Sequence, residues 1–272
     1  MCKYFLAISL VAFNVTAFSQ KHSAALSERI DSLKVIGKNI LGGKTDSARI
    51  ASNEEFLSLL RETLNNPASF EAPFDSVANV SRLKSPDNLF NIYTWTVPKV
   101  DISAYTFFGF VQYYDTKKKL QVVRLNDASG TIENPQSMKL KPEDWLGAVY
   151  YGIDENKKGG KKYYTLLGWK GQSQVTTKKL IDVMYFKKDS VMFGYPLFKS
   201  EKGYVNRVVF EYAAEAAMSL RFEQSKKMIV FDNLSGTGDN TAGPNGRYDA
   251  YKLVKGRWEF IKDVDVSKFS NR

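Results

Sequence analysis

Beyond residue 20, apolar positions follow first a helical spacing and then an alternating one. Over residues 23–41 they recur every three or four positions, and Gly42 with Gly43 then ends the pattern, so a helix is predicted there. A second helix is predicted from a capping box formed by Ser52 and Glu55. Each apolar stripe is narrow, so the two helices are expected to pack on each other or on a sheet.

From about residue 73 onward, short runs rich in Tyr, Phe, Val and Thr alternate with turn residues, which is typical of β-strands. The centre of this pattern is residues 161–198, where three aromatic-rich runs with short polar connectors predict a meander. About eleven antiparallel strands are expected. Several runs are apolar on both faces and should lie between two layers, so a sandwich-like arrangement is favoured over a propeller.

Two segments interrupt the strand pattern. Residues 213–217 are rich in alanine and predict one helical turn. Residues 232–246 contain four glycines and a proline and predict a long loop. The chain is therefore expected to be mainly β with an N-terminal α-helical pair and antiparallel meander sheets.

The first twenty residues, MCKYFLAISLVAFNVTAFSQ, have the pattern of a secretory signal peptide. Lys3 precedes an apolar run, and Ala17 with Ser19 occupies the small-residue positions of a cleavage site. We expect a signal peptide at 1–19, an N-terminal helical segment at 20–72, an antiparallel β domain at 73–266 and a C-terminal tail at 267–272. The mature protein should be periplasmic or secreted, with no transmembrane segment after cleavage.

The formal net charge is +10 at pH 7. An exported chain rarely meets nucleic acid, so this partner is not expected. Lysine doublets fall mostly in connectors, which is typical of solvated turns and protected sheet edges. The alternative interpretation is a surface for anionic glycans or lipid headgroups.

The residue types of several catalytic sites are missing. His22 is the only histidine and lies near the predicted mature terminus, and Cys2, the only cysteine, lies in the predicted signal peptide. A mobile terminus does not hold a general base in place. Serine–histidine triads, cysteine nucleophiles and histidine- or thiolate-ligated zinc are therefore not expected.

Oxygen-bearing side chains gather between residues 232 and 249. The acidic members are Asp232, Asp239 and Asp249, and Asn233, Asn240 and Asn245 lie between them. Such loops suit Ca²⁺, although the spacing fits no known calcium repeat and Asx-turns also account for the composition. No other cofactor is expected.

Two pairs of residues are the candidate binding residues. Tyr163 and Trp169 fall on one face of a predicted strand, where aromatic rings stack sugars or, more commonly, pack in a core. Arg207 and Glu211 are interpreted as a charge pair. Glu211 is also the centre of an enzyme hypothesis, because it could face Asp182 or Glu223 across strands as the two carboxylates of a glycosidase.

Seven segments spread over most of the mature chain carry a resemblance: SPDNLFNIYTW, YYTLLGWKG, KKLIDVMYF, FGYPLF, RVVFEYAAEAAMSLRFE, KMIVFDNLS and YDAYKLVKGRWEF. Together they resemble a group of secreted proteins of Gram-negative bacteria. The resemblance implies export and a single β unit. It implies no activity, cofactor or catalytic residue.

These observations lead to an exported cell-envelope protein that acts as a binding or structural module, with an envelope glycan, lipid or protein as its partner. The alternative is a carboxylate-dependent glycan hydrolase of the periplasm, which requires a convergent acidic pair in a cleft. A third hypothesis is a subunit of a larger envelope assembly, which an uncovered apolar patch would favour.

Overall fold

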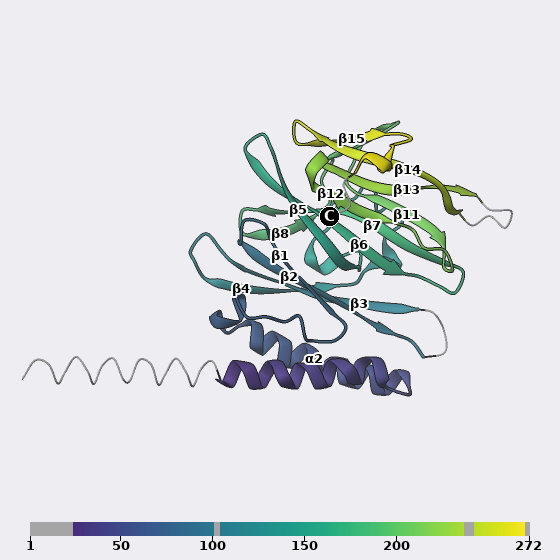
Figure 1. Ribbon diagram of the computed structural model, residues 1–272. Coiled ribbons are helices and arrows are strands. Elements are labelled where there is room, and N and C mark those ends of the chain that lie inside the picture. The colour runs from purple at the N-terminus through teal and green to yellow at the C-terminus, as the bar shows by residue number, and fades with distance from the viewer. Residues whose placement is uncertain (1–23, 101–103, 237–241, 270–272) are drawn as a thin grey trace, which may run out of the picture. The chain divides into compact units, whose positions relative to one another are not determined.

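The structure is a computed structural model that describes residues 24–100, 104–236 and 242–269 (Figure 1). The predicted signal peptide and residues 270–272 of the predicted tail lie outside the described residues. The chain divides into two compact units with a boundary between Asn79 and Val80. Over the described ranges, no helix is both long enough and apolar enough to cross a membrane.

The first unit contains a helix over residues 24–42, α2 (Asp46–Leu64) and a 3₁₀ turn, η1 (Pro67–Phe70). The predicted apolar stripes are the buried faces of the two helices. They comprise Leu26, Ile30, Leu33, Ile36 and Ile40 on one helix and Phe56, Leu57, Leu60 and Leu64 on the other.

The start of the second helix was misplaced by the capping-box pattern. The helix begins at Asp46, and the side chain of Thr45 caps it by accepting a hydrogen bond from the amide of Ala48 at 3.2 Å. Ser52 lies inside the helix instead. Both positions carry residues that cap helices well, and the earlier one is used because the three residues 43–45 suffice to connect the two helices.

The regular elements of the second unit are mainly strands. In the described residues they are β1 (Val80–Lys84), β2 (Phe90–Pro98), β3 (Tyr105–Tyr114), β4 (Leu120–Asn126), β5 (Val149–Lys158), β6 (Lys161–Gly171), β7 (Thr176–Lys187), β8 (Ser190–Phe193), β9 (Phe198–Ser200), β10 (Gly203–Val205), β11 (Val208–Ala213), β12 (Leu220–Glu223), β13 (Met228–Gly236), β14 (Ala242–Val254) and β15 (Arg257–Ile261). Short 3₁₀ turns are η2 (Ser129–Thr131), η3 (Pro142–Asp144), η4 (Gln224–Lys226) and η5 (Val266–Lys268).

The strands form three open sheets (Figure 1). The first has the order β1-β2-β3-β4. The middle sheet has the order β11-β7-β6-β5, and β8 also pairs with β7. The third has the order β10-β9-β15-β14-β13-β12. All pairings are antiparallel except the short one between β9 and β15, which joins Phe198 to Trp258 in parallel.

The middle sheet is buried on both faces. Along β6, Tyr164 and Leu166 belong to an apolar core shared with the first sheet, whereas Tyr163 and Leu167 belong to a second core shared with the third sheet. β7 alternates in the same way, because successive side chains of a strand point to opposite faces. The described residues form neither a barrel nor a propeller, so the mainly β, layered prediction is confirmed.

Two predicted segments between the strands differ from the structure. Residues 214–216 form a turn, in which the amide of Ala214 donates to the carbonyl of Val175 at 2.9 Å, because five residues are too few to start a helix on their own. Residues 232–236 and 242–246 continue β13 and β14 around a register shift after Asp232. In the described part of this region, the polar side chains form hydrogen bonds between the two strands and do not form a loop. For example, the side-chain amide of Asn233 donates to the carboxylate of Asp249 at 2.6 Å.

Candidate functional site

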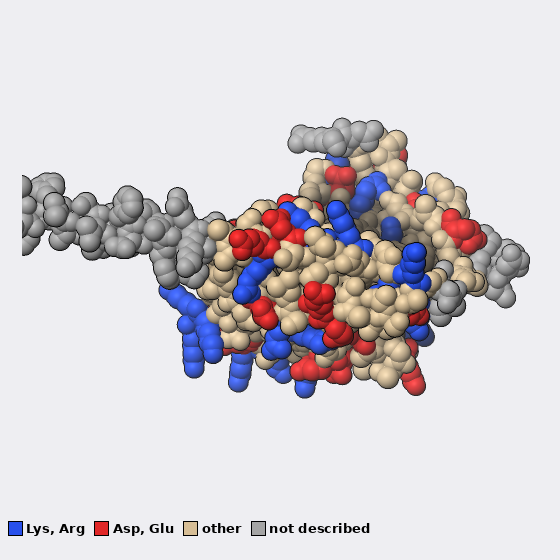
Figure 2. Space-filling model, turned by 90° about the horizontal axis from the view of Figure 1, so that it is seen from below, with Lys and Arg blue, Asp and Glu red and all other residues tan. Residues whose placement is uncertain are grey.

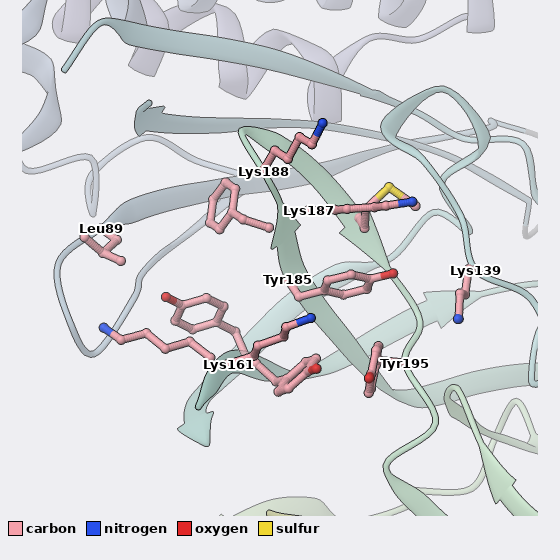
Figure 3. Close-up of a pocket in the computed structure, with 12 residues that line it drawn as sticks. Leu89, Lys139, Lys161, Tyr185, Lys187, Lys188 and Tyr195 are labelled. Atoms are coloured by element: carbon pink, nitrogen blue, oxygen red, sulfur yellow. The ribbon is translucent and has the colours of Figure 1, made fainter. Parts of the chain in front are cut away.

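A cleft of about 670 Å³ opens where the start of β6 meets the end of β7. Its lining is made of lysines and aromatic residues, and we call it the tyrosine–lysine cleft: Lys139, Lys161, Lys162, Lys187, Lys188, Tyr163, Tyr164, Tyr185, Phe186 and Tyr195, with Leu89 and Met192. Figure 3 shows Leu89 and Lys139 toward opposite ends, with Tyr185 between them. Every lining residue belongs to the second unit.

The strand register explains why this lining converges. β6 and β7 form an antiparallel pair that places Tyr164 opposite Met184. Continuing the register by one residue places Tyr163 opposite Tyr185, and the lysine pairs that flank these tyrosines then fall at the same end of the sheet. Two lysine doublets far apart in sequence thereby come together around the aromatic side chains.

Three tyrosines form a contact cluster inside the cleft. The ring centroids of Tyr163 and Tyr195 are 4.4 Å apart, and those of Tyr185 and Tyr195 are 5.3 Å apart in an edge-to-face arrangement. The rings are tilted against one another, so part of each ring face is already covered by a neighbouring ring. The cluster forms a wall of the cleft that carries three hydroxyl groups.

The hydroxyl groups of this cluster are not equivalent. A hydrogen bond from Tyr163 lowers the pKa of Tyr195, and the positive charges of Lys158, Lys161 and Lys139 lower it further. Burial raises the pKa of Tyr163, and its hydrogen bond to Tyr195 adds to that effect. These opposite shifts are expected when Tyr163 donates to Tyr195. The Tyr195 oxygen is therefore the more electron-rich of the two and lies in a positive field.

The lysines give the cleft an uncompensated positive charge. Lys162 is neutralised by Asp87, which also accepts a hydrogen bond from Tyr164 at 2.8 Å. The other four lysines of the cleft form no ion pair with any residue that the structure describes. Lys139 and Lys158 each lie 5.7 Å from the centre of the Tyr195 ring. Lys158 thus adds positive charge behind the tyrosine cluster.

The cleft differs in charge from the face of the molecule shown in Figure 2. On the face shown in Figure 2, lysine and arginine side chains are mixed with aspartate and glutamate side chains. Such mixed charge is typical of a solvated surface without a specific anionic partner. The tyrosine–lysine cleft differs because its lining contains no acidic residue.

The two predicted aromatic binding residues do not form one sugar-stacking platform. Tyr163 is buried in the second core and lines the cleft. Trp169 packs against the first core, where its ring centroid lies 5.2 Å from that of Tyr105. Of the two, only Tyr163 belongs to the candidate site, and it contributes its hydroxyl group more than its ring face.

The predicted pairing of Arg207 with Glu211 was wrong. Arg207 is fully buried and its Nε lies 3.1 Å from Oδ1 of Asp182, which is also fully buried. The Nη1 of Arg207 donates to the carbonyls of Pro135 and Met138. The segment over residues 127–146 folds across β7 and supplies these carbonyls, and sequence spacing does not reveal this.

Glu211 lies on the exposed side of β11. It pairs with Lys178 at 3.2 Å and accepts hydrogen bonds from Gln172 and Thr176. Asp182 is the buried partner of Arg207 instead, so it does not face Glu211 in a cleft. The pairing of Glu211 with Glu223 is likewise not found in the lining of the tyrosine–lysine cleft, and the hydrolase alternative gains no support from this geometry.

The predicted calcium residues lie on β13 and β14, apart from Asp239, which is outside the described residues. Asp232 accepts a hydrogen bond from the amide of Ser219 at 2.6 Å. Asp249 accepts from Asn233 and from the amide of Asp263. Over the described ranges, no group of three or more histidine, cysteine, aspartate or glutamate residues could hold a metal ion. Calcium binding stays a prediction.

Sequence reasoning missed Tyr185 and Tyr195, and it did not place the lysine doublets of the cleft in one site with the tyrosines. The available signal was the combination of two lysine doublets with aromatic residues at the open end of one predicted hairpin. No protein-family model matches the chain, and no curated protein or solved structure matches it significantly. The resemblance to secreted proteins therefore stays an expectation, and the function has to be inferred from the geometry of the cleft.

Proposed function

We propose that this protein is an exported binding module of the cell envelope and that its tyrosine–lysine cleft binds an acidic glycan. The observation that carries the proposal is a single cleft whose lining combines three tyrosines in ring contact with four lysines that form no ion pair in the described part of the chain. The export part of the proposal is supported by the signal-peptide pattern of residues 1–19.

An anionic ligand is favoured by the charge of the lining. Lys139, Lys161, Lys187 and Lys188 are exposed and form no ion pair in the described part of the chain. Bringing like charges together is unfavourable unless counter-ions or a ligand compensate them. A carboxylate, sulfate or phosphate group between these side chains forms charge-assisted hydrogen bonds.

A glycan is favoured over a planar aromatic ligand by the arrangement of the tyrosines. Because Tyr163, Tyr185 and Tyr195 cover part of one another's ring faces, the groups that they offer to a ligand are hydroxyls and ring edges. Hydroxyl groups both donate and accept hydrogen bonds, as sugar hydroxyls do. Acidic sugars combine both requirements in one molecule.

The test is isothermal titration of the mature protein at low ionic strength with three tetrasaccharides. These are an oligogalacturonate, a heparin-derived fragment and neutral maltotetraose. We expect binding of at least one acidic tetrasaccharide and none of the neutral one. Lys161→Gln should weaken that binding about tenfold, since a hydrogen bond to a charged group contributes about 1.5 kcal/mol.

The matched control is Lys226→Gln, which removes the same charge from an exposed lysine of η4 outside the cleft. It should change the affinity less than twofold. Tyr195→Phe, which removes a hydroxyl from the cleft and with it the acceptor of the Tyr163 hydrogen bond, should weaken binding several-fold, and its melting temperature is measured to confirm that it folds. Equal losses in Lys161→Gln and Lys226→Gln would contradict the proposal, as would the absence of binding to both acidic glycans.

A further inference from the structure

A second pocket of about 590 Å³ adjoins the tyrosine–lysine cleft and shares part of its wall. Lys187, Lys188 and Met192 line both. These residues come from the end of β7, the turn and β8, so the β7–β8 hairpin separates the two pockets. We call this second site the hairpin pocket, and its other lining residues include Lys141, Glu143 and Tyr113.

From this adjacency we infer that the ligand is an acidic oligosaccharide long enough to cross the β7–β8 hairpin and occupy both pockets. The inference rests on the proposed function and adds the length and path of the ligand. It commits to a linear polymer with repeated acidic groups and not to a single sugar or a lipid headgroup.

One short segment supplies a lysine to each pocket. Leu140 is buried and forms two backbone hydrogen bonds with Phe193 of β8, at 2.8 and 2.9 Å. Its neighbours in the chain are Lys139, which lines the cleft, and Lys141, which lines the hairpin pocket. In an extended backbone the Cα atoms of two such positions are about 7 Å apart, so the bridge anchors one lysine beside each pocket.

The lysines of the hairpin complete a continuous basic path. Lys187 and Lys188 lie at the boundary and can reach a ligand on either side. Together with Lys139 and Lys141 they place four lysines along the proposed path. A ligand confined to the cleft would leave Lys141 unused, whereas a polymer with regularly spaced acidic groups meets all four.

The acidic residues of the hairpin pocket are compatible with this path. Asp189 is already engaged, because it accepts hydrogen bonds from the amide and the hydroxyl of Thr116, both at 2.9 Å. Glu143 is exposed at η3. Both carboxylates carry a negative charge, but the three lysines of the same pocket outnumber them, and the combined lining of both pockets stays positive. Each pocket has the size of a typical small-molecule site.

The experiment compares oligogalacturonates of two, four and six units by isothermal titration on the full mature protein. We expect the hexamer to bind at least tenfold more tightly than the dimer. Lys141→Gln should weaken hexamer binding about fivefold and leave dimer binding unchanged. Lys161→Gln should weaken the binding of both. Lys226→Gln serves as the charge control, and melting temperatures verify that each variant folds.

The outcomes separate this inference from the function on which it rests. Affinity that does not depend on length, or equal effects of Lys141→Gln on the dimer and the hexamer, overturns the two-pocket path while the cleft stays a glycan site. If Lys161→Gln has no effect on any oligomer, the proposed function fails as well. Tighter binding of a single-stranded oligonucleotide of equal charge, with the same dependence on Lys141, overturns the assignment to glycans.

Discussion

Replacement of Arg207 by methionine should destabilise the second unit strongly. The side chain is fully buried and bonds to Asp182 and to the carbonyls of Pro135 and Met138. In its absence the buried Asp182 carboxylate keeps, among the described residues, the amide of Val183 at 2.8 Å and a 3.3 Å contact with the hydroxyl of Tyr150. Removing one partner of a buried ion pair typically costs about 3–5 kcal/mol.

A double-mutant cycle isolates the contribution of this ion pair. The variants are Arg207→Met, Asp182→Leu and the double replacement, and the free energy of unfolding is measured with urea through tryptophan fluorescence. The double variant should be less destabilised than Arg207→Met alone, since it leaves no unpaired buried charge. We expect a coupling energy of at least about 2 kcal/mol.

The exposed pair of Lys178 with Glu211 is the internal control. Its atoms are 3.2 Å apart, similar to the buried pair, but the side chains are 25% and 46% exposed. Its coupling energy should be about 0.2–1 kcal/mol. The burial argument is refuted if the two cycles give the same coupling, or if Arg207→Met unfolds at the same urea concentration as the original protein.

Three further predictions concern pH, packing and metal. Burial lowers the pKa of Lys170 from 10.5 to about 8, so between these two pH values the unfolded chain holds this proton more tightly than the folded protein, and stability should rise with pH. From pH 8 to 10 the free energy of unfolding, measured with urea, should rise by about 2 kcal/mol more in the original protein than in Lys170→Met. Equal pH profiles of the two proteins would contradict this. Gly194→Ala should lower the free energy of unfolding by about 2–4 kcal/mol, because φ is +82° and a Cβ would lie 2.5 Å from the carbonyl oxygen of Met138. Gly159→Ala, where φ is +56° and the space around the Cβ is open, should lower it by only about 1 kcal/mol. If residues 232–249 bind calcium, a chelator should lower the melting temperature and calcium should restore it, and an unchanged melting temperature and calcium content would rule this site out.

The layers could be predicted from the sequence because burial leaves a direct trace in it. Adjacent residues such as Tyr163 and Tyr164 are both large and apolar in body, and only a strand with two covered faces accepts such a run. The helices could be predicted for the same reason, since each shows a single apolar stripe. The start of α2 could not, because Thr45 and Ser52 are equally good caps.

The site could be predicted only in part. Tyr163 was identified as a binding residue, but the lysines around it come from three segments. The register of β6 and β7 brings two of them together, and Lys139 joins them through the bridge between Leu140 and Phe193. The position of that bridge depends on how residues 127–146 fold over the middle sheet. Arg207 was assigned to the wrong acid for the same reason, because its partner Asp182 lies on another strand and is separated from it by 25 residues.

The burial of the middle sheet on both sides has a consequence for synthesis of the chain. β7 ends at Lys187, but β15, which helps to cover the second core, ends at Ile261. A ribosome adds about 5–20 residues per second, so the apolar side of β6 and β7 stays uncovered for several seconds after these strands emerge. During that interval the nascent chain exposes an apolar strand surface, to which a chaperone that holds unfolded polypeptides could bind.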